Sequence, residues 1–279
     1  MILPIDFDFT QGNLQDYLDC PYRFYMRYIL RTKWPALVVG DALEFEARGQ
    51  AGGRFHRLVQ QHLLGVPENR INQMADEDPN PELRAWWDGF LANVPPWLVG
   101  EHWVETTLTT ELAGHRLVAK YDLILSDRGG GLTIFDWKTS HKLLRKDWLL
   151  ERIQTRLYRL VLLEASPLFT GGELLTAGRI TMNYWFTAQP QTPVSLPYQT
   201  SAYQRDRSDL SRLIEEISIS KPSDFRRTDD VKKCHFCIYR SHCDRGIEAG
   251  DLEDFDDFDL EPGDIEREIG FEDLPEIKF

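Results

Sequence analysis

One apolar stretch of the sequence ends in two charged residues that could do chemistry together. Residues 132–140 read Leu-Thr-Ile-Phe-Asp-Trp-Lys-Thr-Ser, and this β-branched and aromatic start is typical of a buried strand. Because side chains at i and i+2 of a strand lie on one face, Asp136 and Lys138 are expected side by side. Burying two charges is costly unless they pair or bind a ligand, so an ordinary salt bridge and a functional site are both open interpretations.

A second carboxylate precedes this stretch across a glycine-rich turn. Asp122 lies in an expected strand over residues 116–125, and residues 127–131, Asp-Arg-Gly-Gly-Gly, predict a hairpin turn. The hairpin would bring Asp122 close to Asp136, and two carboxylates repel each other unless a divalent cation lies between them. Carboxylate oxygens suit Mg²⁺ or Mn²⁺, and the neighbouring Lys138 could position water or stabilise a phosphate under attack. The pattern therefore indicates metal-assisted hydrolysis of a phosphodiester.

The helix expected over residues 146–164 offers two further polar side chains. Gln154 and Tyr158 are four residues apart and therefore share one helix face. They could form hydrogen bonds with a scissile phosphate or with Lys138. The alternative interpretation is a partly buried amide and a core tyrosine.

Four cysteines form a second constellation. Cys234, Cys237 and Cys243 have the compact spacing of a metal-binding loop, whereas Cys20 lies more than 200 residues earlier. A structural zinc site usually takes its ligands in local pairs. One remote and three local thiolates suit a 4Fe-4S cluster instead. We therefore predict a 4Fe-4S cluster, with zinc or thiols without metal as the alternatives.

The order of the candidate residues resembles the PD-(D/E)XK nuclease superfamily, and specifically its RecB-like branch. In chain order these residues are His56, Asp122, Asp136, Lys138, Gln154 and Tyr158. Alone, a histidine such as His56 is more often structural than a ligand. The resemblance implies that Lys138 is the catalytic lysine. It also implies that the divalent metal is bound by His56, Asp122, Asp136 and the main-chain carbonyl of Trp137.

Some members of that branch also resemble the chain in their cysteines. The CRISPR-associated RecB-like nuclease and the AddB nuclease domain share one N-terminal and three C-terminal cysteines, and the start seen here as Cys20-Pro21-Tyr22-Arg23-Phe24. The resemblance implies a metal-dependent DNA exonuclease that acts on single-stranded ends or flaps. It also implies a role in DNA repair, recombination or CRISPR adaptation, with a helicase or another such protein as partner. A non-catalytic DNA-binding accessory module and a redox-responsive regulator are the alternatives.

The acidity of the chain is concentrated at its end. The net charge is −13, but residues 248–279 hold 14 acidic and 2 basic side chains, which leaves about −1 for residues 1–247. We expect one nuclease domain over 1–247 and an acidic, disordered tail over 248–279. The alternative is that the tail docks on a partner or covers a basic DNA groove.

We expect a cytoplasmic protein that does not bind membranes. The longest apolar runs are far shorter than the ~18 residues of a membrane helix. The N-terminus also lacks the basic start and long apolar core of a signal peptide. In that compartment disulfides are not expected, which favours a metal role for the cysteines.

The periodicity predicts an α/β fold with a mixed central sheet flanked by helices. The resemblance implies a restriction-endonuclease-like core, with an N-terminal helical region and a C-terminal cysteine loop joined by the cluster. In the second helix, Gly49, Gly52 and Gly53 allow a close approach or a break. The expected helices cover residues 10–31 with a bend at Pro21, 41–64, 81–93, 146–164 and 201–218. The expected strands cover 103–112, 116–125, the stretch from 132 and 178–188, with loops at 66–80 and at 189–199, the latter with a short edge strand.

Overall fold

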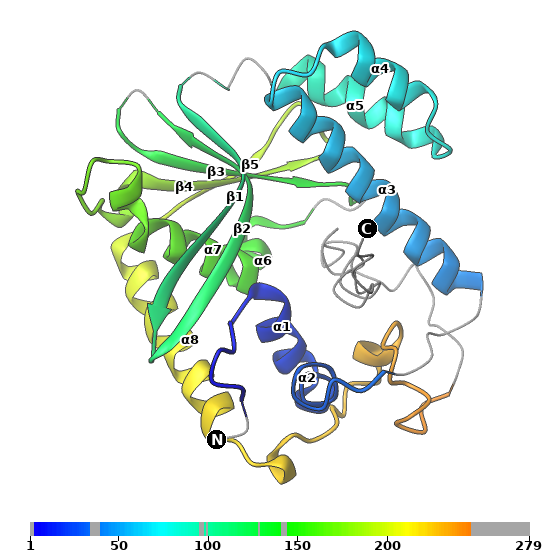
Figure 1. The fold of residues 1–279 in the computed structure, drawn as a ribbon, viewed down its shortest axis with the longest axis vertical. Coiled ribbons are helices and arrows are strands. Elements are labelled where there is room, and N and C mark those ends of the chain that lie inside the picture. The colour runs from blue at the N-terminus through cyan, green and yellow to red at the C-terminus, as the bar shows by residue number, and fades with distance from the viewer. Residues whose placement is uncertain are drawn as a thin grey trace, which may run out of the picture.

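The centre of the protein is a five-stranded sheet. The structure is a computed structural model that describes residues 3–33, 40–94, 98, 100–127, 129–140 and 144–246, so the acidic tail over 248–279 lies outside it. The strands are β1 (His102–Leu112), β2 (His115–Ser126), β3 (Leu132–Lys138), β4 (Ile180–Phe186) and β5 (Val194–Pro197), in this spatial order. Strands β3 and β4 are parallel and the other neighbours antiparallel, which confirms the predicted mixed sheet (Figure 1).

One face of the sheet is covered by α7 (Ile153–Glu164), which packs against β1, β2 and β4. Two further helices, α1 (Gln11–Asp19) and α8 (Thr200–Ile219), pack against α7 on the same side. The side chains of Leu157 and Val161 are fully buried in the core that these elements share. Burial of this apolar surface is what fixes α7 against the sheet.

The opposite face is covered by α3 (Gly40–Leu63), with α4 (Glu68–Asp76) and α5 (Pro81–Asn93) packed against it (Figure 1). A second core lies here and is strongly aromatic. Its large side chains include Phe55, Trp87, Phe90, Trp137 and Trp185. The rings of Phe90 and Trp137 meet edge to face with centroids 5.5 Å apart, which is a favourable geometry for aromatic rings.

The remaining elements are short. Among the residues that the structure describes they are α2 (Pro21–Phe24), a π-helical turn (Tyr25–Ile29), α6 (Lys146–Glu151) and 3₁₀ segments at Ser166–Leu168, Ala177–Arg179, Pro222–Asp224 and Val231–Cys234. The predicted bend is confirmed, because α1 ends at Asp19 and α2 begins at Pro21. In the described part of the chain, no helix is both long and apolar enough to cross a membrane.

A two-residue turn sets the register of β1 and β2. Ala113 and Gly114 have φ angles of +51° and +73°, the signs that a type I′ turn requires. The turn places Leu112 opposite His115, and the pairing continues from there to His102 opposite Leu125.

The glycine-rich turn sets the register of β2 and β3. The Asp127 side chain accepts hydrogen bonds from the amides of Gly129 and Gly131, at 2.7 and 2.9 Å. A β-carbon at Gly131 would lie 2.5 Å from Asp127 Oδ2, so this position requires glycine. The resulting register places Leu123 opposite Phe135, so Asp122 lies near Phe135 and Asp136, as predicted from the hairpin.

Strands β1 and β2 exchange faces part-way along their hairpin. Tyr121 lies in the core beneath α7 and Leu123 in the core beneath α3, although residues two apart in a regular strand share a face. The exchange occurs where the pairing skips Glu105 of β1 and Asp122 of β2, which face each other at that point. Glu105 has a φ of +49°, in the left-handed region. The backbone irregularity therefore coincides with two acidic residues.

Two sequence predictions of secondary structure were wrong in part. Residues 66–80 were expected to form a loop, but they contain α4. Ile71 and Ala75 bury one face of this helix, and Asn72 Oδ1 accepts a hydrogen bond of 2.7 Å from Trp87 Nε1. Tertiary contacts with α5 thus stabilise a helix whose polar sequence alone favours a loop.

The helix expected over residues 146–164 is interrupted. Arg152 has φ −66° and ψ 140°, an extended conformation that ends α6 and begins α7. Its guanidinium carbon lies 4.4 Å from the centre of the Trp148 ring. The interruption changes the direction of the chain just before Gln154.

A buried ion pair between α7 and α8 yields a stability prediction. Asp206 is fully buried and binds Arg156 at 2.7 Å and Arg159 at 3.4 Å, whereas Asp209 binds Arg156 from a side chain that is 34% exposed. We expect Asp206→Asn to lower the free energy of unfolding by about 3–5 kcal/mol, because it leaves buried guanidinium charge uncompensated. Asp209→Asn should cost less than about 1 kcal/mol. Urea unfolding of both variants measures the difference, and equal losses would contradict it.

Candidate active site

The charged pair at the end of β3 is buried and held from two sides. Lys138 Nζ lies 3.0 Å from Asp136 Oδ2, and the two side chains are 6% and 5% exposed. Asp136 Oδ1 accepts a hydrogen bond of 2.8 Å from Gln154 Nε2, in the first turn of α7. The ammonium of Lys138 also lies 5.9 Å from the centre of the Tyr184 ring. Asp136 Oδ1 is therefore held by a hydrogen bond and Oδ2 by the ion pair with Lys138.

The two polar residues predicted to share a face of α7 have different surroundings. Gln154 contacts Asp136, not Lys138, through the hydrogen bond just described. Tyr158 is 5% exposed and lies in the core beneath α7, with its ring centroid 5.0 Å from that of Tyr121. The hydroxyl of Tyr121 donates a hydrogen bond to the main-chain oxygen of Tyr158. Gln154 thus belongs to the charged site, and the burial of Tyr158 fits the alternative of a core tyrosine.

A glycine allows α3 to reach the site. A β-carbon at Gly52 would lie 2.9 Å from Thr139 Oγ1, so helix and strand end approach more closely than a larger residue permits. One turn later, His56 Nδ1 lies 3.2 Å from Asp122 Oδ1, with side chains 13% and 14% exposed. The long-range packing of α3 therefore brings His56 to Asp122.

Asp122 connects this helix to β3. Its Oδ2 accepts a hydrogen bond of 2.9 Å from the main-chain amide of Trp137. Burial raises the pKa of Asp122. The nearby His56, the Trp137 amide and Lys138 together lower this pKa by a larger amount, so it lies below its usual value. Asp122 is thus an ionised, partly accessible carboxylate. That the Trp137 carbonyl binds metal stays a prediction.

The sequence analysis missed one acidic residue of this site. Ligand atoms of His56, Glu105 and Asp122 all lie within 4.8 Å of one another, and each residue is partly buried. Burial and the neighbouring Asp122 raise the pKa of Glu105, while Lys120, whose Nζ lies 2.7 Å from Glu105 Oε2, opposes this. A two-residue turn at 113–114 sets a strand register in which residue 105 lies opposite residue 122. This register could have identified Glu105 from the sequence as a neighbour of Asp122.

The donor set fits a divalent cation. One imidazole nitrogen and two carboxylates are ligand types that Mn²⁺ and Mg²⁺ accept, and their partial exposure leaves a route for an ion. Within the described residues, this group of three does not include Asp136, whose oxygens face Lys138 and Gln154. The site therefore has a buried, fixed part and a more accessible part.

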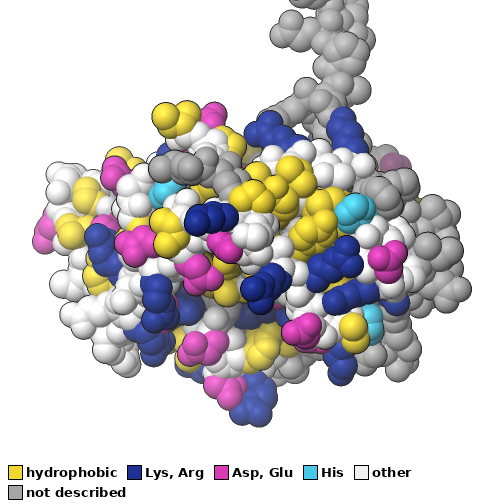
Figure 2. All heavy atoms as spheres, turned by 90° about the horizontal axis from the view of Figure 1, so that it is seen from below, with side chains coloured by type: hydrophobic (Ala, Val, Ile, Leu, Met, Phe, Trp, Pro, Cys, Tyr) yellow, Lys and Arg dark blue, Asp and Glu magenta, His cyan; other side chains and the backbone are white. Residues whose placement is uncertain are grey.

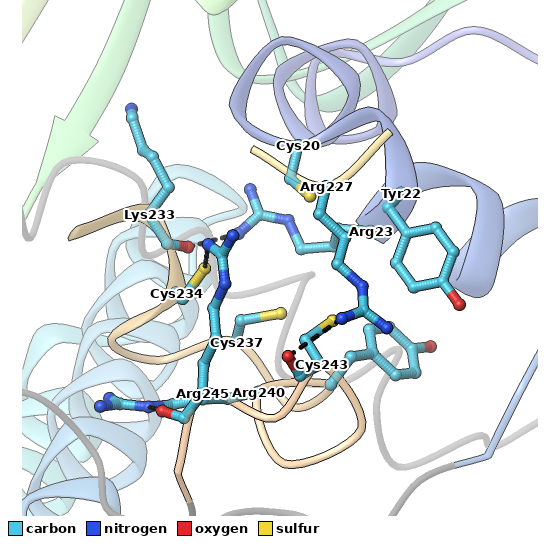
Figure 3. Close-up of a pocket in the computed structure, with 11 residues that line it drawn as sticks. Cys20, Tyr22, Arg23, Arg227, Lys233, Cys234, Cys237, Arg240, Cys243 and Arg245 are labelled. Atoms are coloured by element: carbon cyan, nitrogen blue, oxygen red, sulfur yellow. Dashed lines mark hydrogen bonds between the residues drawn. The ribbon is translucent and has the colours of Figure 1, made fainter. Parts of the chain in front are cut away.

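The four cysteines come from opposite ends of the domain sequence and converge on one pocket. Cys20 precedes α2, and the other three lie on the loop after α8, yet all four line the same small pocket. Figure 3 shows their sulfurs directed toward it from two separate segments. The remote cysteine thus lines the same pocket as the three local ones, as a group held by all four thiolates would require.

Positively charged side chains surround this pocket. Arg245 Nη1 donates a hydrogen bond of 3.0 Å to Cys234 Sγ (Figure 3). The lining also includes Arg23, Arg227, Lys233 and Arg240. Cations stabilise thiolates, so the surroundings fit a group held by four thiolates. Within the described residues, no three of these sulfurs all lie within 4.8 Å of one another, whereas the tetrahedral thiolate ligands of one zinc ion lie about 3.8 Å apart, so the spacing suits a larger thiolate-held group.

Two of the thiols that line this pocket have raised pKa values. Burial raises the pKa of Cys237 to about 11, although Arg23 acts in the opposite direction. Burial also raises the pKa of Cys243. Ligation of a metal would therefore displace protons from these sulfurs.

The two segments are also joined directly by side chains. The Tyr22 hydroxyl lies 3.2 Å from His242 Nε2, and the two rings are stacked. Lys233 Nζ lies 2.8 Å from Asp19 Oδ1, and the Tyr22 amide donates to the carbonyl of Arg226 at 3.1 Å. These contacts hold the cysteine loop against α1 and α2.

Comparison with protein families identifies the kind of protein to which this site belongs. Residues 8–244 match the model of the PD-(D/E)XK nuclease superfamily, and that span includes all the candidate residues discussed above. The chain belongs to the PD-(D/E)XK nuclease superfamily. Nucleases of this superfamily use divalent metals, and membership implies DNA as the substrate. The superfamily resemblance is thereby confirmed, whereas the RecB-like branch and the cluster stay predictions.

Two solved structures are similar to this PD-(D/E)XK nuclease over much of its length. A protein from Eubacterium rectale described as "putative exonuclease" is 12% identical with a TM-score of 0.47, covering 75% of this chain and 79% of that one. A protein named SSO0001 is 15% identical with a TM-score of 0.37, covering 87% and 88%. These values are too low to add to the superfamily assignment. No curated protein matches the chain.

The contact between Gln154 and Asp136 gives a testable prediction for this nuclease. Gln154→Leu keeps the side-chain volume but removes the donor that orients Asp136, so we expect metal-dependent DNA cleavage to slow about 10–100-fold. Initial rates on labelled single-stranded DNA with Mn²⁺ measure this effect. The control Gln204→Leu changes an exposed glutamine of α8 and should leave the rate unchanged. A Gln154→Leu enzyme that is folded by circular dichroism and cleaves within twofold of wild type would contradict the role.

Proposed function

We propose that this protein is a metal-dependent DNA exonuclease of the RecB-like branch that acts on single-stranded ends or flaps. The proposal is supported above all by the arrangement around the end of β3. There the buried Asp136–Lys138 pair lies beside an accessible histidine–carboxylate group, within a chain whose superfamily is shown. The alternative of an ordinary salt bridge explains the pair but not the neighbouring group.

Each residue has a separate task in this proposal. His56 and Asp122 would hold the divalent metal together with Asp136 and the Trp137 carbonyl, and a metal bound there would supply positive charge to stabilise the phosphate under attack. Lys138 stabilises negative charge that develops on the phosphate. Gln154 keeps the Asp136 carboxylate in its orientation through the 2.8 Å hydrogen bond. Tyr158 supports the packing of α7 beneath the site.

The face that carries α2 and the cysteine loop does not show a continuous basic band. In Figure 2, lysine and arginine side chains on this face are interspersed with acidic and apolar ones. Residues 1–247 also carry a net charge of only about −1. Affinity for DNA in this proposal therefore comes from local basic groups rather than from net charge.

The catalytic proposal predicts a large loss on removal of the lysine. Purified wild-type protein should degrade labelled linear single-stranded DNA in the presence of Mn²⁺, and Lys138→Ala should slow cleavage about 10²–10³-fold because charge stabilisation is lost. Lys221→Ala, which removes an exposed lysine outside the site, is the matched control.

Linear and circular single-stranded DNA distinguish exonuclease activity from nuclease activity in general. An exonuclease leaves covalently closed single-stranded circles intact while it degrades linear DNA, so cleaved circles would refute the exonuclease assignment and keep the nuclease. Cleavage that persists in Lys138→Ala would indicate a contaminating enzyme. Absence of cleavage by the wild-type protein on all substrates would favour a non-catalytic DNA-binding accessory module.

We include a 4Fe-4S cluster held by Cys20, Cys234, Cys237 and Cys243 in the proposal. The convergence of four cysteines in a cationic pocket supports a thiolate-held group, and their uneven spacing favours a cluster over zinc. In this role the cluster ties the N-terminal helices to the C-terminal loop. DNA repair, recombination or CRISPR adaptation, with a helicase as partner, is the setting that the branch suggests.

The cluster is tested by chemical analysis. Protein purified without oxygen should be brown and contain about four iron and four sulfide per chain. Cys234→Ala should lose both and unfold at a lower temperature, because a link between the chain ends is gone. Ser241→Ala in the same loop should keep the cluster. A colourless preparation with one zinc per chain would show that the cluster assignment is wrong, and a redox-dependent DNA affinity without cleavage would favour a regulator.

A further inference from the structure

Glu105 occupies an unusual position for an ordinary surface acid. The β1–β2 pairing skips it and Asp122, so the two carboxylates face each other across neighbouring strands. Like charges directly opposite each other destabilise a sheet. Glu105 also has a left-handed backbone, with φ of +49°, which is unfavourable for a residue with a side chain. Both features need a compensating interaction.

The contact with Lys120 is a weak compensation. Lys120 Nζ lies 2.7 Å from Glu105 Oε2, but the lysine side chain is 66% exposed, whereas that of Glu105 is 19% exposed. Exposed ion pairs contribute little to stability because water and salt screen them. A solvated ammonium at this place is readily displaced by a cation of higher charge.

The position of Glu105 relative to His56 provides an independent observation. A carboxylate oxygen of Glu105 lies within 4.8 Å of both the imidazole nitrogen of His56 and a carboxylate oxygen of Asp122. These residues come from α3, β1 and β2, so three separate elements direct one nitrogen and two carboxylates to one place. Repulsion alone would turn two carboxylates apart, and a shared divalent ion removes that repulsion.

We propose that Glu105 is a ligand of the divalent metal, together with His56 and Asp122, and that Lys120 neutralises Glu105 when no ion is bound. The inference rests on the proposed function, because it concerns the metal of the same nuclease site. Glu105 adds an accessible carboxylate to a site in which Asp136 is already held by Lys138 and Gln154. The imidazole nitrogen makes Mn²⁺ the suitable probe, since Mg²⁺ prefers oxygen ligands alone.

Metal binding without DNA tests this role directly. We would titrate Mn²⁺ into the full-length wild-type protein and into Glu105→Gln by calorimetry, and follow the rise in unfolding temperature with Mn²⁺ as a second readout. Glu105→Gln should weaken Mn²⁺ binding at least tenfold. Glu111→Gln removes an exposed acid from the same strand and should bind Mn²⁺ within twofold of wild type.

A variant of Lys120 gives an effect of the opposite sign. Lys120→Gln removes the competing ammonium and should strengthen Mn²⁺ binding, but only while Glu105 is present, so Lys120→Gln combined with Glu105→Gln should bind like Glu105→Gln alone. A residue with a merely structural role would not produce this dependence. The measurement on Lys120→Gln also keeps the test valid if Glu105→Gln does not fold.

The outcomes separate this inference from the proposed function. If wild-type protein binds Mn²⁺ and cleaves DNA while Glu105→Gln binds Mn²⁺ equally well, Glu105 is not a ligand and the nuclease assignment stands. If Lys120→Gln leaves Mn²⁺ affinity unchanged, its proposed competition is overturned. If the wild-type protein neither binds Mn²⁺ nor cleaves DNA, both proposals fail.

Discussion

The register of the β1–β2 hairpin places two carboxylates opposite each other in the sheet. Glu105 of β1 faces Asp122 of β2 where their pairing is interrupted, and the last pair of β2 with β3, Leu123 with Phe135, lies one residue from Asp122 and from Asp136. Opposed carboxylates are unfavourable in a sheet, because charges of one sign directly opposite each other repel. The surrounding structure compensates with cationic and hydrogen-bonding groups from other elements, and these groups are the ones on which the chemistry depends.

The second constraint is the meeting of chain segments that are far apart in sequence. Stacking of Tyr22 on His242 and the ion pair of Lys233 with Asp19 bring the cysteine loop to the N-terminal helices. The same N-terminal region contributes α1 to the layer that covers α7, and α7 carries Gln154 to the charged site. A group bound by the cysteines would therefore support, at a distance, the helix that orients Asp136.

Local sequence signals predicted the end of β3 and its hairpin with β2, whereas contacts that depend on long-range packing could not be predicted from the sequence. The glycine-rich turn sets its own register through Asp127, so the approach of Asp122 to Asp136 followed from a few adjacent residues. The contact of His56 with Asp122 depends on how α3 packs, and only the family resemblance suggested it. Glu105 was missed because the pattern of β1 is that of an ordinary strand, and its left-handed backbone is a property of the folded hairpin.

Exposure divides the site into two parts with different physical properties. Lys138 and Asp136 are 6% and 5% exposed, so their geometry is fixed and their interaction is only weakly screened by solvent. His56, Asp122 and Glu105 are between 13% and 19% exposed, so water and ions can reach them. A permanently buried divalent ion would exchange slowly, and a fully exposed lysine would give little stabilisation to a phosphate. The division therefore suits hydrolysis of a phosphodiester in which an exchangeable ion and the substrate approach from the accessible side and meet a preoriented lysine.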